Sequence, residues 1–228
     1  MKILITGAGR GIGFQIAAAM AERGHQVFAT YRNCSKQLME LKETYERVIL
    51  WEMDVTSEAA VQKAADQVKK IWGTLDGVVS NAGCLSDRDR ENRIFDMRPE
   101  DLEEMLKVNV IGPARVIRCF SPLMEKGGVF ITITSEAGSI SNAFCDLPGY
   151  SISKAAANKL VSIQHCTTKD YRVLAVHPGR ADTDMGHVSA QITPKESAKG
   201  ICDILTGVKK IPESYGWFIN YRGEQMPL

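Results

Sequence analysis

Seven short apolar runs recur along the whole sequence, and longer amphipathic stretches separate them. Most of the runs are β-branched or apolar at consecutive positions, which is typical of strands that helices cover on both faces. The alternation of such strands with helices indicates repeated βαβ units around a parallel sheet. The expected strands are Lys2–Thr6, Val27–Tyr31, Val48–Met53, Leu75–Ser80, Val129–Thr134, Arg172–His177 and Trp217–Asn220. We therefore predict a single-domain, doubly wound α/β fold over residues 1–228, a seven-stranded parallel sheet with helices on both faces.

Helical patterns lie between these strands, and capping residues mark where several of them begin. Thr56 or Ser57 precedes one pattern as an N-cap. Thr193 and Glu196 form a capping box before another, with proline at the first helical position. The expected helices are Phe14–Arg23, Glu58–Trp72, Pro99 to about Phe120, Ser151–His165 and a last one from Pro194 toward Gly207. The pair Gly112-Pro113 predicts an irregularity inside the third of them.

Charge, hydropathy and cysteine usage exclude several classes of protein. The chain has 28 Lys and Arg against 27 Asp and Glu, and this net charge of +1 gives no basic footprint for nucleic acid or a membrane surface. Because no apolar run reaches the roughly 18 residues of a membrane span and no signal peptide is evident, we expect a cytoplasmic protein. The cysteines lack metal-ligand spacing, which favours reduced thiols and no metal site. They are Cys34, Cys84, Cys119, Cys145, Cys166 and Cys202.

A glycine-rich turn, Thr6–Gly13, joins the first strand to the first helical pattern. Phosphates bind where a helix N-terminus offers backbone N–H groups and glycines allow close approach. The spacing departs from G-x-G-x-x-G, and such a turn can also be purely structural. Its place on the first βα unit of a doubly wound sheet favours a dinucleotide site. The residues expected there are Gly7, Arg10, Gly11, Ile12 and Gly13.

The end of the second strand indicates which dinucleotide binds. NAD sites place Asp or Glu there to bond the ribose 2′-OH, whereas NADP sites place cations there. This chain has Arg32 at that place and no acidic residue before Glu40. Arg10 is a second candidate for the 2′-phosphate. The alternative is that both arginines are ordinary solvated surface residues.

Tyr150 and Lys154 lie four residues apart at the start of a helical pattern, so both belong to one helix face. A nearby ammonium favours the phenolate, which makes Tyr150 a candidate general acid/base. Ser135 ends the fifth strand, at the edge of the sheet where such folds bind ligands. Asn109 is a candidate to hold a helix irregularity or a water. A capping serine and a satisfied buried asparagine remain the alternatives for these two residues.

Further motifs occur in a fixed order around these residues. They are Thr6, Gly7, Gly11 and Gly13 in T-G-x-x-x-G-x-G; Asp54-Val55; Asn81-Ala82-Gly83; then Asn109, Ser135, Tyr150 and Lys154; and finally Pro178-Gly179 with Thr183. With these matches the chain resembles the short-chain dehydrogenase/reductase family over essentially its whole length. The segment after Pro178 and the ending Phe218–Tyr221 resemble the carbonyl-reductase-like branch that includes the sniffer and C-factor proteins.

The resemblance implies a Rossmann fold, NADP(H) as cofactor and a role for each matched residue. Tyr150 would donate a proton to the carbonyl oxygen, Ser135 would hold that oxygen, and Asn109 would carry a water in a proton relay. Lys154 would lower the pKa of Tyr150 and hold the nicotinamide ribose. Asp54 would bond the adenine, Asn81 would support the backbone, and Thr183 would meet the carboxamide. The implied cofactor contacts are Gly7, Arg10, Gly11, Ile12, Gly13, Arg32, Asp54, Val55, Asn81, Ala82, Gly83, Tyr150, Lys154, Pro178, Gly179 and Thr183.

Three features depart from the resemblance. Arg180 stands where the branch has a large apolar residue, and it either binds an acidic carbonyl substrate or pairs with Asp182 or Asp184. Glu136 follows Ser135, and we expect it to be solvated. Residues 86–93 are strongly charged, which is typical of a solvated loop.

The leading hypothesis is an NADPH-dependent oxidoreductase that reduces a small aldehyde or ketone to an alcohol, or catalyses the reverse. The alternative is a nucleotide-binding signalling or regulatory protein of the C-factor type, against which the intact Ser135, Tyr150 and Lys154 argue. A sugar-nucleotide epimerase or dehydratase spaces its glycines differently and usually carries an extra substrate domain. Two long helices, Glu100–Phe120 and Ser151–His165, are apolar on more than one stripe, which predicts a homodimer or homotetramer.

Overall fold

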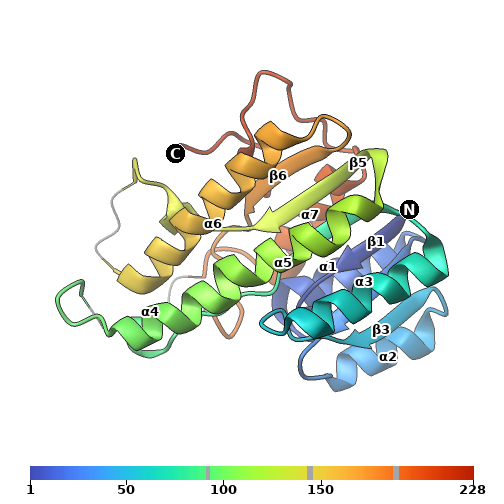
Figure 1. Cartoon of the computed structure of the whole chain (residues 1–228), viewed down its shortest axis with the longest axis horizontal. Coiled ribbons are helices and arrows are strands. Elements are labelled where there is room, and N and C mark those ends of the chain that lie inside the picture. The colour runs from blue at the N-terminus through green and yellow to red at the C-terminus, as the bar shows by residue number, and fades with distance from the viewer. Residues whose placement is uncertain (91–92, 143–145, 187–189) are drawn as a thin grey trace.

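A seven-stranded parallel sheet forms the centre of the molecule (Figure 1). The strands are β1 (Lys2–Ile5), β2 (Gln26–Tyr31), β3 (Val48–Glu52), β4 (Leu75–Ser80), β5 (Met124–Ile133), β6 (Arg172–His177) and β7 (Phe218–Asn220). Their order across the sheet is β3-β2-β1-β4-β5-β6-β7, and every neighbouring pair is parallel. The chain crosses from one side of β1 to the other after β3, which is the arrangement of a doubly wound sheet. The predicted fold class is confirmed.

The computed structural model describes residues 1–90, 93–142, 146–186 and 190–228. Cys145 therefore lies outside the described residues, as do Glu91 and Asn92 of the charged segment. Within these ranges, no helix is both long enough and apolar enough to cross a membrane. The same ranges contain no group of three or more His, Cys, Asp or Glu side chains arranged to hold a metal ion.

Helices cover both faces of the sheet. They are α1 (Gly11–Glu22), α2 (Lys36–Thr44), α3 (Glu58–Trp72), α4 (Pro99–Leu106), α5 (Gly112–Phe120), α6 (Pro148–Thr167) and α7 (Pro194–Leu205). One hydrophobic cluster joins α1, α2 and α7 to the sheet, and a second joins α3, α5 and α6. Alternation along β1 divides the two clusters, since Ile3 and Ile5 belong to the first and Leu4 to the second.

Several elements begin earlier than the sequence predicts, among them α1 at Gly11 rather than Phe14 and β2 at Gln26 rather than Val27. α6 starts at Pro148 rather than Ser151, so Tyr150 lies inside the first helical turn. β5 starts at Met124, where it pairs with Leu75 ahead of a register shift in the ladder. α2 is not among the expected helices, although a serine caps its first turn.

The irregularity predicted between Pro99 and Phe120 is a π-helical segment. α4 ends at Leu106, Lys107–Ile111 (η2) form the π-helix, and α5 begins at Gly112. The wider turn directly precedes Pro113, which has no N–H to donate to an ordinary helical hydrogen bond. This segment brings Asn109 into the interior, with 1% of its surface exposed.

The carboxyl ends of parallel strands share one edge of the sheet, at the left in Figure 1. Six of the predicted site segments directly follow strands β1 to β6. They are the glycine-rich turn, Arg32, Asp54-Val55, Asn81–Gly83, Ser135 and Pro178-Gly179. The fold thus brings residues from the whole sequence to one edge.

Candidate active site

The glycine-rich turn bends the chain from β1 into the N-terminus of α1. Gly7 and Gly11 have φ angles of 67° and 59°, where a side chain would be strained. A Cβ on Gly7 would lie 2.9 Å from the Ala82 Cα, and one on Gly13 would lie 2.3 Å from the Gly7 carbonyl oxygen. The N-cap, Arg10, gives no side-chain hydrogen bond to the helix. Backbone N–H groups at this helix start therefore have no capping side chain, which is the arrangement that binds anions.

Asn81, at the end of β4, holds this turn in place. Its Nδ2 donates to the carbonyl oxygens of Thr6 and Gly7 at 3.0 and 3.2 Å. The Thr6 hydroxyl in turn accepts from the backbone N–H groups of Asn81 and Ala82 at 3.0 and 3.1 Å. Ile12, the second residue of α1, packs against the hydrophobic core. These hydrogen bonds tie the glycine-rich turn to the end of β4.

Arg32 and Asp54 follow the next two strands. Arg32 is exposed, and Val55 beside Asp54 is buried. Thr56 donates to Asp54 Oδ1 from its backbone N–H at 2.8 Å and from its hydroxyl at 2.7 Å. Burial raises the pKa of Asp54, but the Thr56 hydrogen bonds and the Arg32 and Arg115 charges outweigh it and hold the pKa below its usual value. Asp54 is therefore a carboxylate within the field of Arg32.

The segment after β6 lies against the glycine-rich turn. Thr183 Cγ2 would be 3.4 Å from a Cβ on Gly11. Arg10 forms an ion pair with Asp184. The two segments that the resemblance assigns to the cofactor thus meet in space.

Gly179 makes the bend between β6 and this segment. Its φ is 79°, and a Cβ there would lie 2.5 Å from Ile192 Cδ1 and 2.9 Å from the Tyr221 ring. The Pro178 carbonyl accepts from the Ser197 hydroxyl at 2.6 Å. The bend is therefore fixed to α7 and to the end of the chain.

The Asn109 amide joins the π-helical segment to α6. Its Oδ1 accepts from the Cys84 N–H at 2.8 Å, and its Nδ2 donates to the Cys84 carbonyl at 2.9 Å and to the Ser153 hydroxyl at 3.0 Å. The Ser153 hydroxyl donates to the Tyr150 carbonyl at 2.7 Å. A Cβ on Gly83 would lie 3.2 Å from Asn109 Oδ1. Hydrogen bonds thus connect the segment after β4 to the turn that carries Tyr150.

Tyr150, Ser135 and Lys154 converge at the carboxyl edge of the sheet. The Ser135 side chain lies near enough to the Tyr150 phenol to oppose the rise of the Tyr150 pKa. Lys154 Nζ lies 5.5 Å from the centroid of the Tyr150 ring and donates to the Ile133 carbonyl at 3.1 Å. Ser135 Oγ also accepts from the Ala137 N–H at 3.2 Å. The structure therefore brings together the hydroxyl, phenol and ammonium that the sequence singles out.

Burial shifts the pKa values of Tyr150 and Lys154 in opposite directions. Burial raises the pKa of Tyr150 to about 12 against the opposing interaction with Ser135, and it lowers the pKa of Lys154 to about 8. Burial is the largest influence on the Tyr150 pKa in this structure, and the lowering of that pKa by Lys154 stays a prediction. The ammonium is engaged with the Ile133 carbonyl.

Arg180 forms an ion pair with Glu136, directly after Ser135. Arg180 Nε lies 2.6 Å from Glu136 Oε1. The Glu136 N–H donates to His177 Nδ1 at 3.1 Å, and His177 Nε2 lies 3.9 Å from the same carboxylate oxygen. Burial lowers the pKa of His177, with Glu136 opposing. Glu136 is thus bonded to β6 rather than simply solvated, and it balances the Arg180 charge.

Comparison with known proteins assigns the family. A family model described as short chain dehydrogenase matches residues 1–192. The chain belongs to the short-chain dehydrogenase family. It is accordingly an oxidoreductase, and the resemblance inferred from the ordered motifs is confirmed.

Relatives of this dehydrogenase include carbonyl reductases and an NADP-bound protein. A putative short-chain dehydrogenase/reductase from Burkholderia multivorans with bound NADP is 26% identical, with a TM-score of 0.88 over 100% of this chain and 99% of that one. Carbonyl reductase Sniffer of D. melanogaster is 25% identical, with a TM-score of 0.88 over the same shares. Versicolorin reductase from Emericella nidulans is 35% identical over 188 residues, which are 80% of this chain and 69% of that protein.

The charged segment of the dehydrogenase is not simply a solvated loop. Asp89 is 1% exposed, and its two carboxylate oxygens accept from the N–H groups of Gly149 and Tyr150. Arg90 Nη2 donates to the Met185 carbonyl at 2.7 Å. The mixed charges predict solvation, and only the tertiary fold shows that these two residues face α6 and the segment after Thr183.

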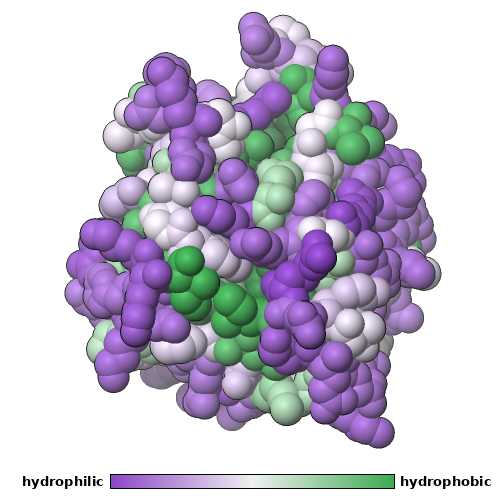
Figure 2. All heavy atoms as spheres, turned by 90° about the vertical axis from the view of Figure 1, so that its right-hand side faces the viewer, coloured by the Kyte–Doolittle hydropathy of each residue, from purple (hydrophilic) through white to green (hydrophobic). Residues whose placement is uncertain are grey.

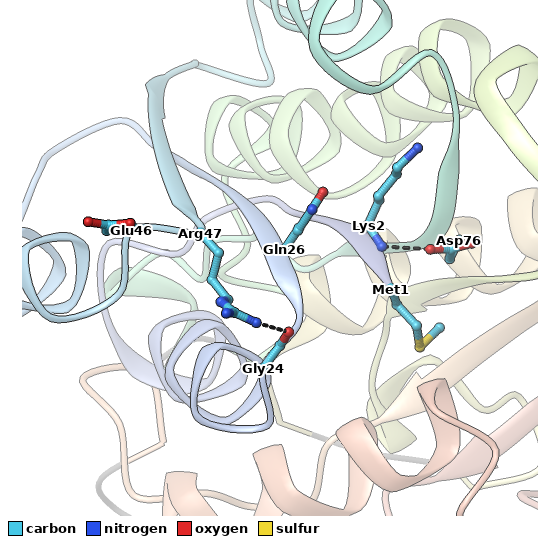
Figure 3. A pocket seen from close by; sticks show the side chains of 7 residues that line it. All are labelled: Met1, Lys2, Gly24, Gln26, Glu46, Arg47 and Asp76. Atoms are coloured by element: carbon cyan, nitrogen blue, oxygen red, sulfur yellow. Dashed lines mark hydrogen bonds between the residues drawn. The ribbon is translucent and has the colours of Figure 1, made fainter.

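A pocket of about 580 Å³ lies at the opposite edge of the dehydrogenase (Figure 3). Its lining includes Lys2, Gln26, Arg47 and Asp76, which lie at the amino ends of β1 to β4. The Lys2 N–H donates to Asp76 Oδ2 at 2.6 Å. Figure 2 shows this side of the molecule as largely hydrophilic with a narrow hydrophobic band. Because doubly wound sheets bind ligands at the carboxyl ends of strands, this pocket does not belong to the candidate active site.

Proposed function

We propose that this dehydrogenase uses NADPH to reduce an aldehyde or ketone to an alcohol and can catalyse the reverse reaction. The observation that carries the proposal is the convergence of Tyr150, Ser135 and Lys154 at the same edge of the sheet as the glycine-rich turn. Similarity to the NADP-bound Burkholderia protein and to carbonyl reductase Sniffer supports it.

The residues at this edge fit a dinucleotide with a 2′-phosphate. The start of α1 at Gly11 would hold the pyrophosphate through its backbone N–H groups, because Arg10 caps the helix without a side-chain bond. Arg10 and Arg32 would supply the cations for the 2′-phosphate. Asp54 would form a hydrogen bond with the adenine. Thr183, which lies against Gly11, would contact the nicotinamide carboxamide.

NADPH supplies the hydride when it is bound. Tyr150 would donate its phenolic proton to the carbonyl oxygen, and the Ser135 hydroxyl would hold that oxygen. Lys154 would bond the nicotinamide ribose and follow Tyr150 as the next group in the proton relay. Asn109 would hold the relay water with its backbone, since its amide is bonded to other protein groups.

Replacing Tyr150 by phenylalanine tests the proposal. We expect Tyr150→Phe to keep the fold and the NADPH dissociation constant and to lose turnover by about two to four orders of magnitude, the range of a general acid. Turnover is followed by NADPH absorbance over a panel of aldehydes, ketones and keto acids. Tyr215→Phe is the matched control, because Tyr215 is 37% exposed and precedes β7.

Two outcomes would contradict this function. Wild-type-like turnover in Tyr150→Phe would place the proton donor elsewhere. Tight NADPH binding without reduction of any carbonyl in the panel would favour the alternative, a nucleotide-binding regulatory protein.

A further inference from the structure

The first turn of α6 has two backbone N–H groups that need an acceptor from outside the helix. The N-cap, Leu147, is left-handed with a φ of 54° and makes no side-chain cap. Pro148 has no N–H, and the Ser151 N–H donates to the Leu147 carbonyl at 2.8 Å. The N–H groups of Gly149 and Tyr150 are therefore the two that find no acceptor within the helix.

Asp89 accepts from both of these groups. Its Oδ1 lies 3.0 Å from the Gly149 nitrogen, and its Oδ2 lies 2.8 Å from the Tyr150 nitrogen. Asp89 belongs to a short helical turn, Arg88–Arg90 (η1), some 60 residues earlier in the chain. The fit is close, because a Cβ on Gly149 would lie 3.0 Å from Asp89 Oδ1 and 2.5 Å from Met105 Cε. Both oxygens of a buried carboxylate are thus committed to the turn that carries Tyr150.

Other bonds fix the same turn and the same short helix. The Tyr150 carbonyl accepts from the Ser153 hydroxyl at 2.7 Å, so the backbone of Tyr150 is held on both sides. Arg90 donates to the Met185 carbonyl at 2.7 Å. The η1 turn therefore connects the start of α6 to the segment that lies over the glycine-rich turn.

We propose that Asp89 is a positioning residue that fixes the Tyr150 hydroxyl relative to the carbonyl substrate. The proposal rests on the proposed function, since Tyr150 must be the proton donor. Charge-assisted hydrogen bonds at a helix N-terminus are strong and directional. A misplacement of about 1 Å at a reacting group costs about 100-fold in rate. The glycine-rich turn, which would bind the pyrophosphate of NADPH, is held by Asn81 rather than by Asp89, so we expect the loss of Asp89 to affect turnover more than NADPH binding.

Asp89→Asn is the principal variant. It keeps the size of the side chain, replaces one acceptor oxygen by a donor and removes the charge. Turnover is measured with NADPH and 4-nitrobenzaldehyde and is divided by the number of NADPH-binding sites. We expect kcat per site to fall at least about tenfold and the isotope effect from NADPH deuterated at both hydride positions to rise. The NADPH dissociation constant should stay within about twofold of wild type.

Asp87→Asn is the matched control. Asp87 lies two residues away in the same segment; its side chain is 99% exposed, and its ion pair with Arg90 at 3.5 Å is screened by solvent and contributes little. We expect wild-type kcat and isotope effect from this variant.

A double variant tests whether Asp89 acts through Tyr150. Two residues that act as a unit are non-additive. Adding Asp89→Asn to Tyr150→Phe should therefore lower the residual turnover no further. A full additional loss would show that Asp89 acts by another route and would overturn the proposal.

The remaining outcomes separate this proposal from the proposed function. If Tyr150→Phe is inactive while Asp89→Asn keeps the wild-type kcat and isotope effect, only the positioning role of Asp89 is overturned. An active Tyr150→Phe overturns the proposed function itself. If Asp89→Asn does not fold, the same kcat, isotope effect and NADPH dissociation constant are measured for Asp89→Ser. This variant keeps one oxygen in a smaller side chain. Failure of both variants to bind NADPH would assign Asp89 to folding and overturn the positioning role.

Discussion

Burial determines the protonation states of Tyr150 and Lys154. It raises the pKa of Tyr150 to about 12 and lowers that of Lys154 to about 8, because a buried site disfavours the charged form of each. Near neutral pH the site therefore holds a neutral phenol beside an ammonium. A carbonyl that accepts hydride becomes an alkoxide, which is a stronger base than a phenolate. Under the proposed function, proton donation from Tyr150 to this alkoxide therefore remains favourable.

The lowered pKa of Lys154 predicts a pH dependence of cofactor capture. The kcat/KM for NADPH reports groups of the free enzyme. If the ammonium form of Lys154 binds the cofactor, this parameter is maximal below pH 8 and falls as the pH rises through about 8, where Lys154 loses its proton. The measurement is kcat/KM for NADPH between pH 6 and 10.

The variant Lys154→Arg tests whether the pH dependence of kcat/KM comes from Lys154 or from another titrating residue. A guanidinium stays charged throughout the range, so we expect a lower kcat/KM without the decrease near pH 8. A decrease of the same midpoint in the variant would assign the titration to another residue.

Arg32 predicts a preference for NADP(H). The exposed guanidinium stands where an NAD site would place a carboxylate. We expect the wild type to bind NADPH at least about tenfold more tightly than NADH, and Arg32→Asp to remove or reverse this ratio. Fluorescence titration of both cofactors measures it.

Lys36→Asp is the control for this charge change. Lys36 starts α2, and its side chain is 89% exposed. A comparable loss of NADPH affinity in Lys36→Asp would mean that net charge, rather than a contact at Arg32, sets the preference.

At the scale of an element, the turn between β1 and α1 depends on the absence of a side chain at Gly13. A Cβ there would lie 2.3 Å from the Gly7 carbonyl oxygen and 2.4 Å from Asn81 Nδ2. Gly13→Ala should therefore lower the free energy of unfolding by about 1–3 kcal/mol, as overpacking does. It should also weaken NADPH binding at least about tenfold, because the backbone that would hold the phosphates moves. Chemical denaturation and cofactor titration at low temperature give the two quantities.

Gly73→Ala is the matched control. Gly73 caps α3 with a φ of 76°, and a Cβ on it would meet nothing within 4 Å. This variant should lose about 1 kcal/mol of stability through backbone strain with NADPH affinity unchanged. Equal loss of affinity in both variants would show that the effect comes from general destabilisation.

Elements whose signals are local in the sequence could be predicted, and those set by tertiary contacts could not. α3 has the expected bounds because its apolar spacing and its Ser57 cap lie within one stretch. The start of α6 was harder to place, because its free N–H groups are satisfied by Asp89 from another segment. The π-helical segment is indicated only by Gly112-Pro113, and its bonds through Asn109 depend on residues after β4.

At the scale of the whole molecule, the parallel sheet explains why the sequence predicts that the candidate site residues meet at one edge. Residues that end strands far apart in sequence must meet at one edge once the strands are parallel, so the motifs identify the site without knowledge of the pairing order. Contacts between loops do not follow from this rule. The ion pair of Arg180 with Glu136 joins the ends of β6 and β5, and no spacing in the sequence indicates it.

The exposed apolar residues of α6 and its neighbour predict self-association. Ile111 of the π-helical segment and Ile152 and Ile163 of α6 are 43%, 41% and 55% exposed, and the two elements pack against each other. Pairing of such faces about a two-fold axis would bury them in a homodimer or homotetramer. Light scattering at micromolar concentration should therefore give at least twice the chain mass of 25.1 kDa. Ile163→Glu should shift the protein toward the monomer because it places a charge in the interface, whereas Val208→Glu, at a residue 75% exposed beyond the end of α7, should not. A wild-type protein of 25.1 kDa alone would contradict the prediction.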